Sequence, residues 1–101
     1  MRYGLFGKIV TKPEQRDKVT AILMRGFEGL KSVGCLVYIV SHDPDNADVI
    51  WVMETWESAE SHAASLQLPE TRAAIAEAMP LLTGEFSQTK LSVVGGLGLP
   101  E

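Results

Sequence analysis

The sequence predicts a single α+β domain in which a four-stranded antiparallel sheet carries its helices on one face. Two observations predict this class. Apolar residues crowd into four short stretches, and between these stretches they recur at three- and four-residue steps, which gives the order β-α-β-β-α-α-β. The chain has 101 residues, 46% of them hydrophobic and 22% charged, which suits one domain with a single core. We expect that domain over residues 1–101, with residues 95–101 as a C-terminal tail.

The first two elements are a strand and a long helix. The strand is expected over Tyr3 to Val10. Residues 11–14, TKPE, then have the Thr-x-x-Glu spacing of a capping box with a proline in the first turn. Gly34 suits the left-handed position that ends a helix. Between these signals the apolar residues of one helical stripe are Val19, Ile22, Leu23, Phe27 and Leu30.

The middle of the chain predicts a β-hairpin followed by two short helices. Its strands are expected over Cys35 to His42 and Val49 to Trp56, joined by the turn DPDN at residues 43–46. Ser58 can cap a helix that runs to about residue 66. A second helix is expected from Pro69 to about residue 79.

The C-terminal part of the chain predicts the last strand and the tail. The strand is expected over Ser87 to Val94. The glycine-rich segment after it is not a dinucleotide-binding loop, because no helix remains to follow it.

Both faces of the predicted sheet are apolar. In the third strand Ile50, Val52 and Trp56 alternate with Val49, Trp51 and Met53. One long and two short helices can cover one face of such a sheet but not both. A bare second face would exceed the few hundred Å² of contiguous apolar surface usual for a soluble monomer. We therefore expect a homodimer whose sheets pack face to face, and alternation alone does not decide which face lines a pocket.

Charge and cysteine content exclude several classes of function. The net charge is −4 and the basic residues are scattered, so no nucleic-acid partner is expected. The longest apolar run, Cys35 to Val40, is too short to span a membrane, and no signal peptide is visible, so the expected location is the cytoplasm. Cys35 is the single cysteine and is expected to be buried. With only His42 and His62 beside it, no metal site is expected.

Two segments of the sequence, together with the order of the predicted strands and helices, resemble the antibiotic biosynthesis monooxygenase domain. VIWVMETWES, at residues 49–58, contains Glu54, Trp56 and Ser58 in the spacing Glu-x-Trp-x-Ser, and ASLQLPETRAAI, at residues 64–75, contains Pro69. The resemblance covers Tyr3 to Val94 and implies a dimeric, ferredoxin-like α+β barrel.

The resemblance implies an activity as well as a fold. Members of this family include cofactor-independent oxygenases of quinols and polyketide phenols, haem-degrading enzymes, and small isomerases or hydrolases. Haem-degrading members use an asparagine in the first strand, where this chain has Phe6, so haem chemistry is disfavoured. We expect a quinol monooxygenase-like enzyme that uses O₂ and no cofactor. The alternative is a non-catalytic dimer that binds a small hydrophobic metabolite, which the scarcity of polar pocket residues favours.

The catalytic candidates are Trp56, Glu54 and His62. Trp56 and Glu54 share one face of the third strand, so both point inward if either does. The indole can stack on a flat ring, and a partly desolvated carboxylate with a raised pKa can accept a phenolic proton. His62 is the other candidate base. Each also has a purely structural interpretation: core packing for Trp56, a structural hydrogen bond for Glu54, and a surface or hydrogen-bonded position for His62.

The candidates for substrate binding are Phe6, Trp56, Ser65 and Arg72. Ser65 stands where many members of the resembling family have a histidine, with His62 one turn earlier. Arg72 can bind an anionic oxygen of a substrate, or it is an exposed helix arginine.

Overall fold

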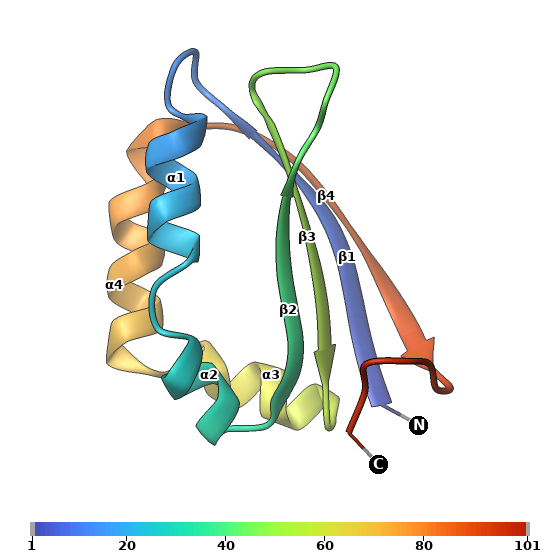
Figure 1. Ribbon diagram of the computed structural model, residues 1–101. Helices are drawn as coiled ribbons and strands as arrows, with labels where there is room; N and C mark the ends of the chain where they lie inside the picture. The colour runs from blue at the N-terminus through green and yellow to red at the C-terminus, as the bar shows by residue number, and fades with distance from the viewer. Residues whose placement is uncertain (1, 101) are drawn as a thin grey trace.

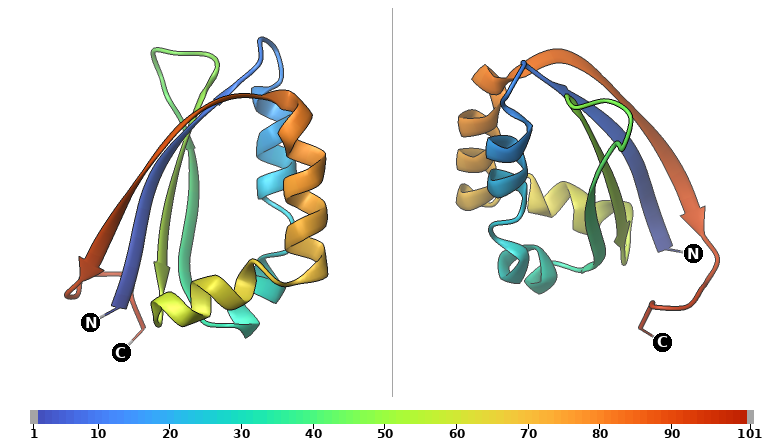
Figure 2. Two further views of the ribbon diagram at one scale, coloured as in Figure 1. Left: turned by 180° about the vertical axis from the view of Figure 1, so that it is seen from behind. Right: turned by 45° about the horizontal axis from the view of Figure 1, so that its top comes forward.

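Residues 2–100, which a computed structural model describes, form one sheet layer and one helix layer (Figure 1). The sheet is antiparallel with the strand order β2-β3-β1-β4, and the helices lie on one of its faces, as Figure 2 shows from two further directions. The predicted α+β, ferredoxin-like fold is confirmed, while the terminal residues 1 and 101 of the predicted domain lie outside the described range. The elements are β1 (Arg2–Thr11), α1 (Arg16–Leu23), α2 (Phe27–Ser32), β2 (Cys35–His42), β3 (Val49–Trp56), α3 (Ala59–Ser65), α4 (Pro69–Ala78), the 3-10 helix η1 (Met79–Leu81) and β4 (Leu82–Val93).

The long helix predicted after the first strand is wrong, because it is two helices. Gly26 interrupts it with a left-handed φ of 80°, and α2 begins at the next residue. The predicted capping box does not form either. Thr11 stays in β1, where its backbone N–H donates to the Asp48 carbonyl at 2.8 Å, and α1 starts only after Gln15. Because Thr11 is paired in the sheet, it does not occupy the N-cap position that a capping box requires.

The hairpin and the two short helices have the expected bounds. Strands β2 and β3 coincide with the predicted ranges. Ser58 caps α3 by accepting a hydrogen bond from the Ser61 N–H at 3.1 Å, and Pro69 occupies the first turn of α4. The last strand begins at Leu82, five residues before the predicted start at Ser87, because it stays paired with β1 as far as Thr11.

Gly34 ends α2 and makes a close contact that a side chain would disrupt. Its φ is 107°, and a Cβ atom there would lie 2.7 Å from the Ser61 hydroxyl oxygen at the start of α3. Gly26 also has a positive φ, of 80°, but has open space around it.

We expect Gly34→Ala to lower the free energy of unfolding by more than Gly26→Ala. The shared left-handed strain costs about 1–2 kcal/mol, and only Gly34 adds a steric clash. Urea denaturation of both variants measures the difference. Equal losses would show that α3 accommodates the added methyl group.

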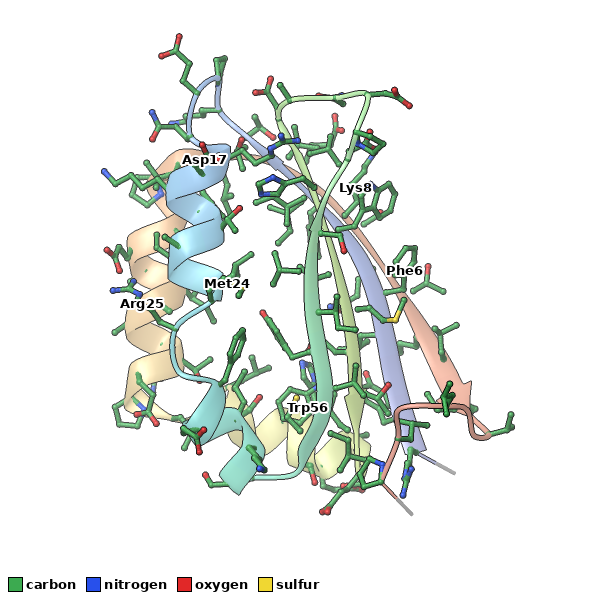
Figure 3. The ribbon with its side chains drawn as sticks, in the orientation of Figure 1. Phe6, Lys8, Asp17, Met24, Arg25 and Trp56 are labelled. Atoms are coloured by element: carbon green, nitrogen blue, oxygen red, sulfur yellow. The ribbon has the colours of Figure 1, made fainter. Side chains whose placement is uncertain are left out.

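The two faces of the sheet differ in what covers them. Leu5, Ile50 and Trp56 face the helices and are at most 1% exposed. The residues that alternate with these along each strand point the other way, to a surface that no described helix or strand covers, as Figure 3 shows for Phe6 and Lys8. We call this surface the open face. Its exposed apolar side chains, between 39% and 51% exposed, are Phe6, Ile39, Met53 and Leu91.

Within residues 2–100, no helix combines the length and the apolar character needed to cross a lipid bilayer.

Candidate active site

A cavity of about 290 Å³ lies between the sheet and the helices. Every strand of the sheet contributes at least one residue to it, and so do α1, α2, α3, α4 and η1. Its wall is mostly aliphatic, which suits a small apolar or aromatic ligand with few polar groups. The polar and ionisable residues that line it are Arg25, Tyr38, Glu54, His62, Ser65, Glu70, Thr71 and Gln88.

Glu54 and Trp56 lie together on the wall of this cavity that β3 provides. Because strand residues two apart share a face, both side chains turn toward the helices. The Trp56 indole N–H donates to Glu54 Oε1 at 2.9 Å, and the indole itself is 1% exposed. This bond leaves the second carboxylate oxygen, Oε2, without a hydrogen bond from any residue in the range 2–100.

The protonation of Glu54 is set by two opposing effects. Burial raises the pKa of Glu54 above its ordinary value of 4.5, because the charged form loses its water, and the Trp56 hydrogen bond partly offsets this effect. A carboxyl group with a raised pKa is a better match for proton transfer near neutral pH than an exposed one.

His62 lies beside the two strand residues, on α3. Its ring meets the Trp56 ring edge-on, with centroids 5.3 Å apart, and lies 5.7 Å from the Tyr3 ring. Burial lowers the pKa of His62, so the imidazole is held in its neutral form. A neutral imidazole can accept a proton. His62 and Glu54, the two candidate bases, therefore line one cavity.

Ser65 is 2% exposed and lines the same cavity. Its hydroxyl donates to the His62 carbonyl at 2.6 Å, one turn back along α3. The proton of this hydroxyl is therefore engaged, while its oxygen can still accept a hydrogen bond from a ligand.

Phe6 and Arg72 do not line this cavity. Phe6 lies on the open face, where it stacks on Trp51 with ring centroids 5.3 Å apart and an angle of 12° between the planes. The alternation of strand residues explains this position, because Leu5 and not Phe6 turns toward the helices. Arg72 lies outside the helical stripe of α4 that faces the cavity, to which Thr71 belongs.

Tyr38 is a cavity residue that sequence reasoning missed. A β-bulge between Cys35 and Val37 shifts the pairing of β2, so Tyr38 is the register partner of Glu54 and turns the same way. Simple alternation from Cys35 would place Tyr38 on the opposite face. No sequence signal marks the bulge, so only the strand pairing reveals this residue.

Two further ionisable groups near the cavity are already neutralised. Arg25 forms an ion pair with Glu77 of α4, so its charge is matched within the helix layer. Cys35 is buried as predicted, and desolvation with the nearby Glu54 charge raises its pKa to about 11, so the thiol stays protonated.

Among residues 2–100 no group of three or more His, Cys, Asp or Glu side chains could hold a metal ion.

Residues 3–77 match the family described as antibiotic biosynthesis monooxygenase. The chain belongs to this family. Over 99% of its length it is 44% identical to a candidate antibiotic biosynthesis monooxygenase from Chloroflexus aurantiacus J-10-fl, with 100% of that chain covered and a TM-score of 0.87. The resemblance predicted from residues 49–58 and 64–75 is therefore confirmed.

Other solved structures described as candidate antibiotic biosynthesis monooxygenases share the fold. One from Caulobacter crescentus CB15 is 20% identical, with 93% of this chain and 91% of that chain covered and a TM-score of 0.77. One from Nitrosomonas europaea is 8% identical, with 92% and 90% covered and a TM-score of 0.84. At these identities the likeness concerns the fold alone. No protein with a curated description matches this chain.

Proposed function

We propose that this chain is a cofactor-independent monooxygenase that oxidises an aromatic phenol or quinol to a quinone with O₂. The observation that carries the proposal is the half-buried Glu54 carboxyl group in a mostly aliphatic cavity, with one oxygen held by Trp56 and the other available as a base. Membership of the family supports oxygenase chemistry, and the cavity supports a flat apolar substrate.

The proposed reaction begins with a proton transfer. Glu54 removes the proton from a substrate hydroxyl through Oε2, and the O–H bonding electrons stay on the substrate as a phenolate. An aliphatic wall keeps water from this anion, so it remains electron-rich. His62 lies at the same wall and is the alternative base.

Oxygen supplies both the oxidising power and the new oxygen atom. The phenolate passes one electron to O₂, and the radical pair recombines at a ring carbon that bears hydrogen, which forms a C–O bond. The resulting peroxide anion loses water: the ring carbon passes its hydrogen as a proton to the outer peroxide oxygen as the O–O bond breaks, and Glu54 returns its proton to the hydroxide that departs. The product is a quinone, with one water released for each O₂ consumed. The protein residues supply position, desolvation and proton transfer.

Oxygen uptake with a panel of hydroquinones and anthrone-like phenols tests the proposal. The buffer contains a chelator and no flavin, and product spectra confirm that a quinone forms. One quinone per O₂ is the expected stoichiometry. An absence of uptake with every member of the panel would contradict the proposed reaction.

A second candidate function is a binding module for a small hydrophobic metabolite. Two hydrogen-bonding protons at the cavity are engaged inside the protein: the Trp56 N–H by the Glu54 carboxylate, and the Ser65 hydroxyl by the His62 carbonyl. Tight binding of panel compounds without oxygen uptake would favour this alternative.

We further propose that the protein is a homodimer in which the open faces of two sheets pack together. Four large apolar side chains lie together on this one sheet surface and are between 39% and 51% exposed. They are Phe6, Ile39, Met53 and Leu91. Burial of such a patch against its own copy is favourable by about 25 cal/mol per Å² of apolar area.

Analytical ultracentrifugation at micromolar concentration is expected to give about twice the chain mass of 11.0 kDa. Phe6→Lys should shift the protein toward the monomer, because it introduces a charge into the centre of the open face. Met24→Lys is the matched control, since Met24 is 51% exposed but belongs to the helix layer. A monomeric wild-type protein, or equal dissociation of both variants, would contradict the dimer.

A further inference from the structure

Tyr38 is an ionisable residue of the cavity that has no part in the proton transfer by Glu54 or in the reaction with O₂. It faces Glu54 across the β2–β3 pairing, and both side chains line the cavity. Its hydroxyl makes no hydrogen bond with any of the residues from 2 to 100, and none of their buried polar side-chain atoms lacks a partner. The hydroxyl is therefore accessible to a molecule bound in the cavity.

The ring of Tyr38 is fixed from the helix layer. Phe27, the first residue of α2, packs against it with ring centroids 5.7 Å apart and an angle of 54° between the planes. Packing of this kind restricts the orientation of the ring and hence of the hydroxyl. Strand β2 fixes the other end, so the donor has a defined position next to Glu54.

The environment also keeps Tyr38 in its neutral form. Burial raises the pKa of Tyr38 well above its ordinary value of 10.0, and the nearby Glu54 carboxylate acts in the same direction. Arg25, His62 and Glu70 also line the cavity, and Arg25 is paired with Glu77. A tyrosine that stays protonated is a hydrogen-bond donor at every pH at which the enzyme would work.

We propose that the Tyr38 hydroxyl donates a hydrogen bond to the substrate oxygen from which Glu54 takes the proton. The inference rests on the proposed function and adds a second residue to its first step. As the substrate O–H bond breaks, the proton moves to Glu54 and the negative charge that remains on oxygen accepts the Tyr38 hydrogen bond. Such a bond strengthens as the charge develops, so it stabilises the phenolate more than the phenol. Phe27 is then a positioning residue.

4-Nitrophenol is a suitable probe because its anion absorbs visible light and its electron-poor ring resists oxidation. Spectrophotometric pH titration of the protein-bound probe reports where its hydroxyl ionises, without any turnover. Tyr38→Phe is expected to raise the apparent pKa of the bound probe by about 1–2 relative to the wild-type complex, as loss of one hydrogen bond to a charged oxygen would. That change corresponds to a roughly 10- to 100-fold smaller ionisation constant.

Tyr3→Phe is the matched control, since it removes the same hydroxyl from a tyrosine that contacts the His62 ring but does not line the cavity. Its titration should coincide with that of the wild type. Circular dichroism checks that both variants are folded. An unchanged titration of the Tyr38→Phe complex, equal shifts in both variants, or no binding of millimolar probe to the wild type would overturn the inference.

The two proposals can fail separately. Tyr38-dependent ionisation of the probe without oxygen uptake from any phenol would support the Tyr38 subsite and contradict the monooxygenase. Oxygen uptake together with an unchanged Tyr38→Phe titration would support the monooxygenase and contradict the Tyr38 subsite.

Discussion

Glu54→Gln is expected to lower the rate of oxygen uptake by about 10²- to 10⁴-fold, the usual contribution of a positioned general base. The amide has nearly the same shape as the carboxyl group, and its oxygen can still accept the Trp56 N–H bond that Glu54 Oε1 accepts at 2.9 Å. It cannot take up a proton. Initial rates with an active phenol at constant pH, corrected for the folded fraction, measure the effect.

The same variant should gain stability at neutral pH. Burial raises the pKa of folded Glu54 above its ordinary value of 4.5, so the folded protein binds a proton more tightly than the unfolded chain does. The contribution of a group with a raised pKa is fully present below its unfolded value and is lost as the pH rises through its folded value. Because glutamine carries no charge, Glu54→Gln removes this loss of stability at high pH.

We therefore expect the denaturation midpoint of Glu54→Gln to exceed that of the wild type at pH 7 and to approach it below pH 4.5, the ordinary value for Glu54. A lower activity combined with a higher stability is typical of a residue kept for function. His62→Gln provides the comparison, since His62 lines the same cavity. If His62→Gln lost far more activity than Glu54→Gln, the base would be the histidine.

Trp56→Phe is expected to change both stability and the pH dependence of activity. Trp56 is 1% exposed, so the smaller ring leaves a space in the core that should cost about 1–3 kcal/mol of unfolding free energy. The substitution also removes the N–H that donates to Glu54 Oε1. Because this bond lowers the pKa of Glu54, its loss should raise that pKa further.

A base with a higher pKa is deprotonated only at higher pH. The acid limb of the rate profile of Trp56→Phe should therefore lie at higher pH than that of the wild type, and its specific activity near neutral pH should be lower. Rates from pH 5 to 9 and urea denaturation midpoints measure the two effects. A loss of stability with an unchanged pH profile would leave Trp56 as a core residue only.

Trp51→Phe is a closely matched control for this experiment. The Trp51 N–H also donates to a carboxylate, Asp43 Oδ2, at 2.9 Å, but Trp51 belongs to the open face of the sheet. Its replacement removes an equivalent hydrogen bond from outside the cavity, so the pH profile of oxygen uptake should match that of the wild type.

Local sequence patterns predicted the secondary structure well where each signal acts within a few residues. Ser58 caps α3 because its hydroxyl reaches the Ser61 N–H three residues later. The predictions were wrong where a distant partner competes. Thr11 has the spacing of a capping box, yet its N–H pairs with Asp48, which is 37 residues away, and so it remains in the sheet.

The sequence by itself determined the α+β class, the hairpin, and the common face of Glu54 and Trp56, because alternation along one strand follows from backbone geometry. Only the tertiary structure decided which face of each strand meets the helices. It placed Phe6 on the open face and brought Tyr38 beside Glu54 through the bulge in β2. The physical reason is that pairing between strands, and not the order of residues along one strand, sets which side chains share a surface, and a one-residue shift in register reverses every side chain that follows it.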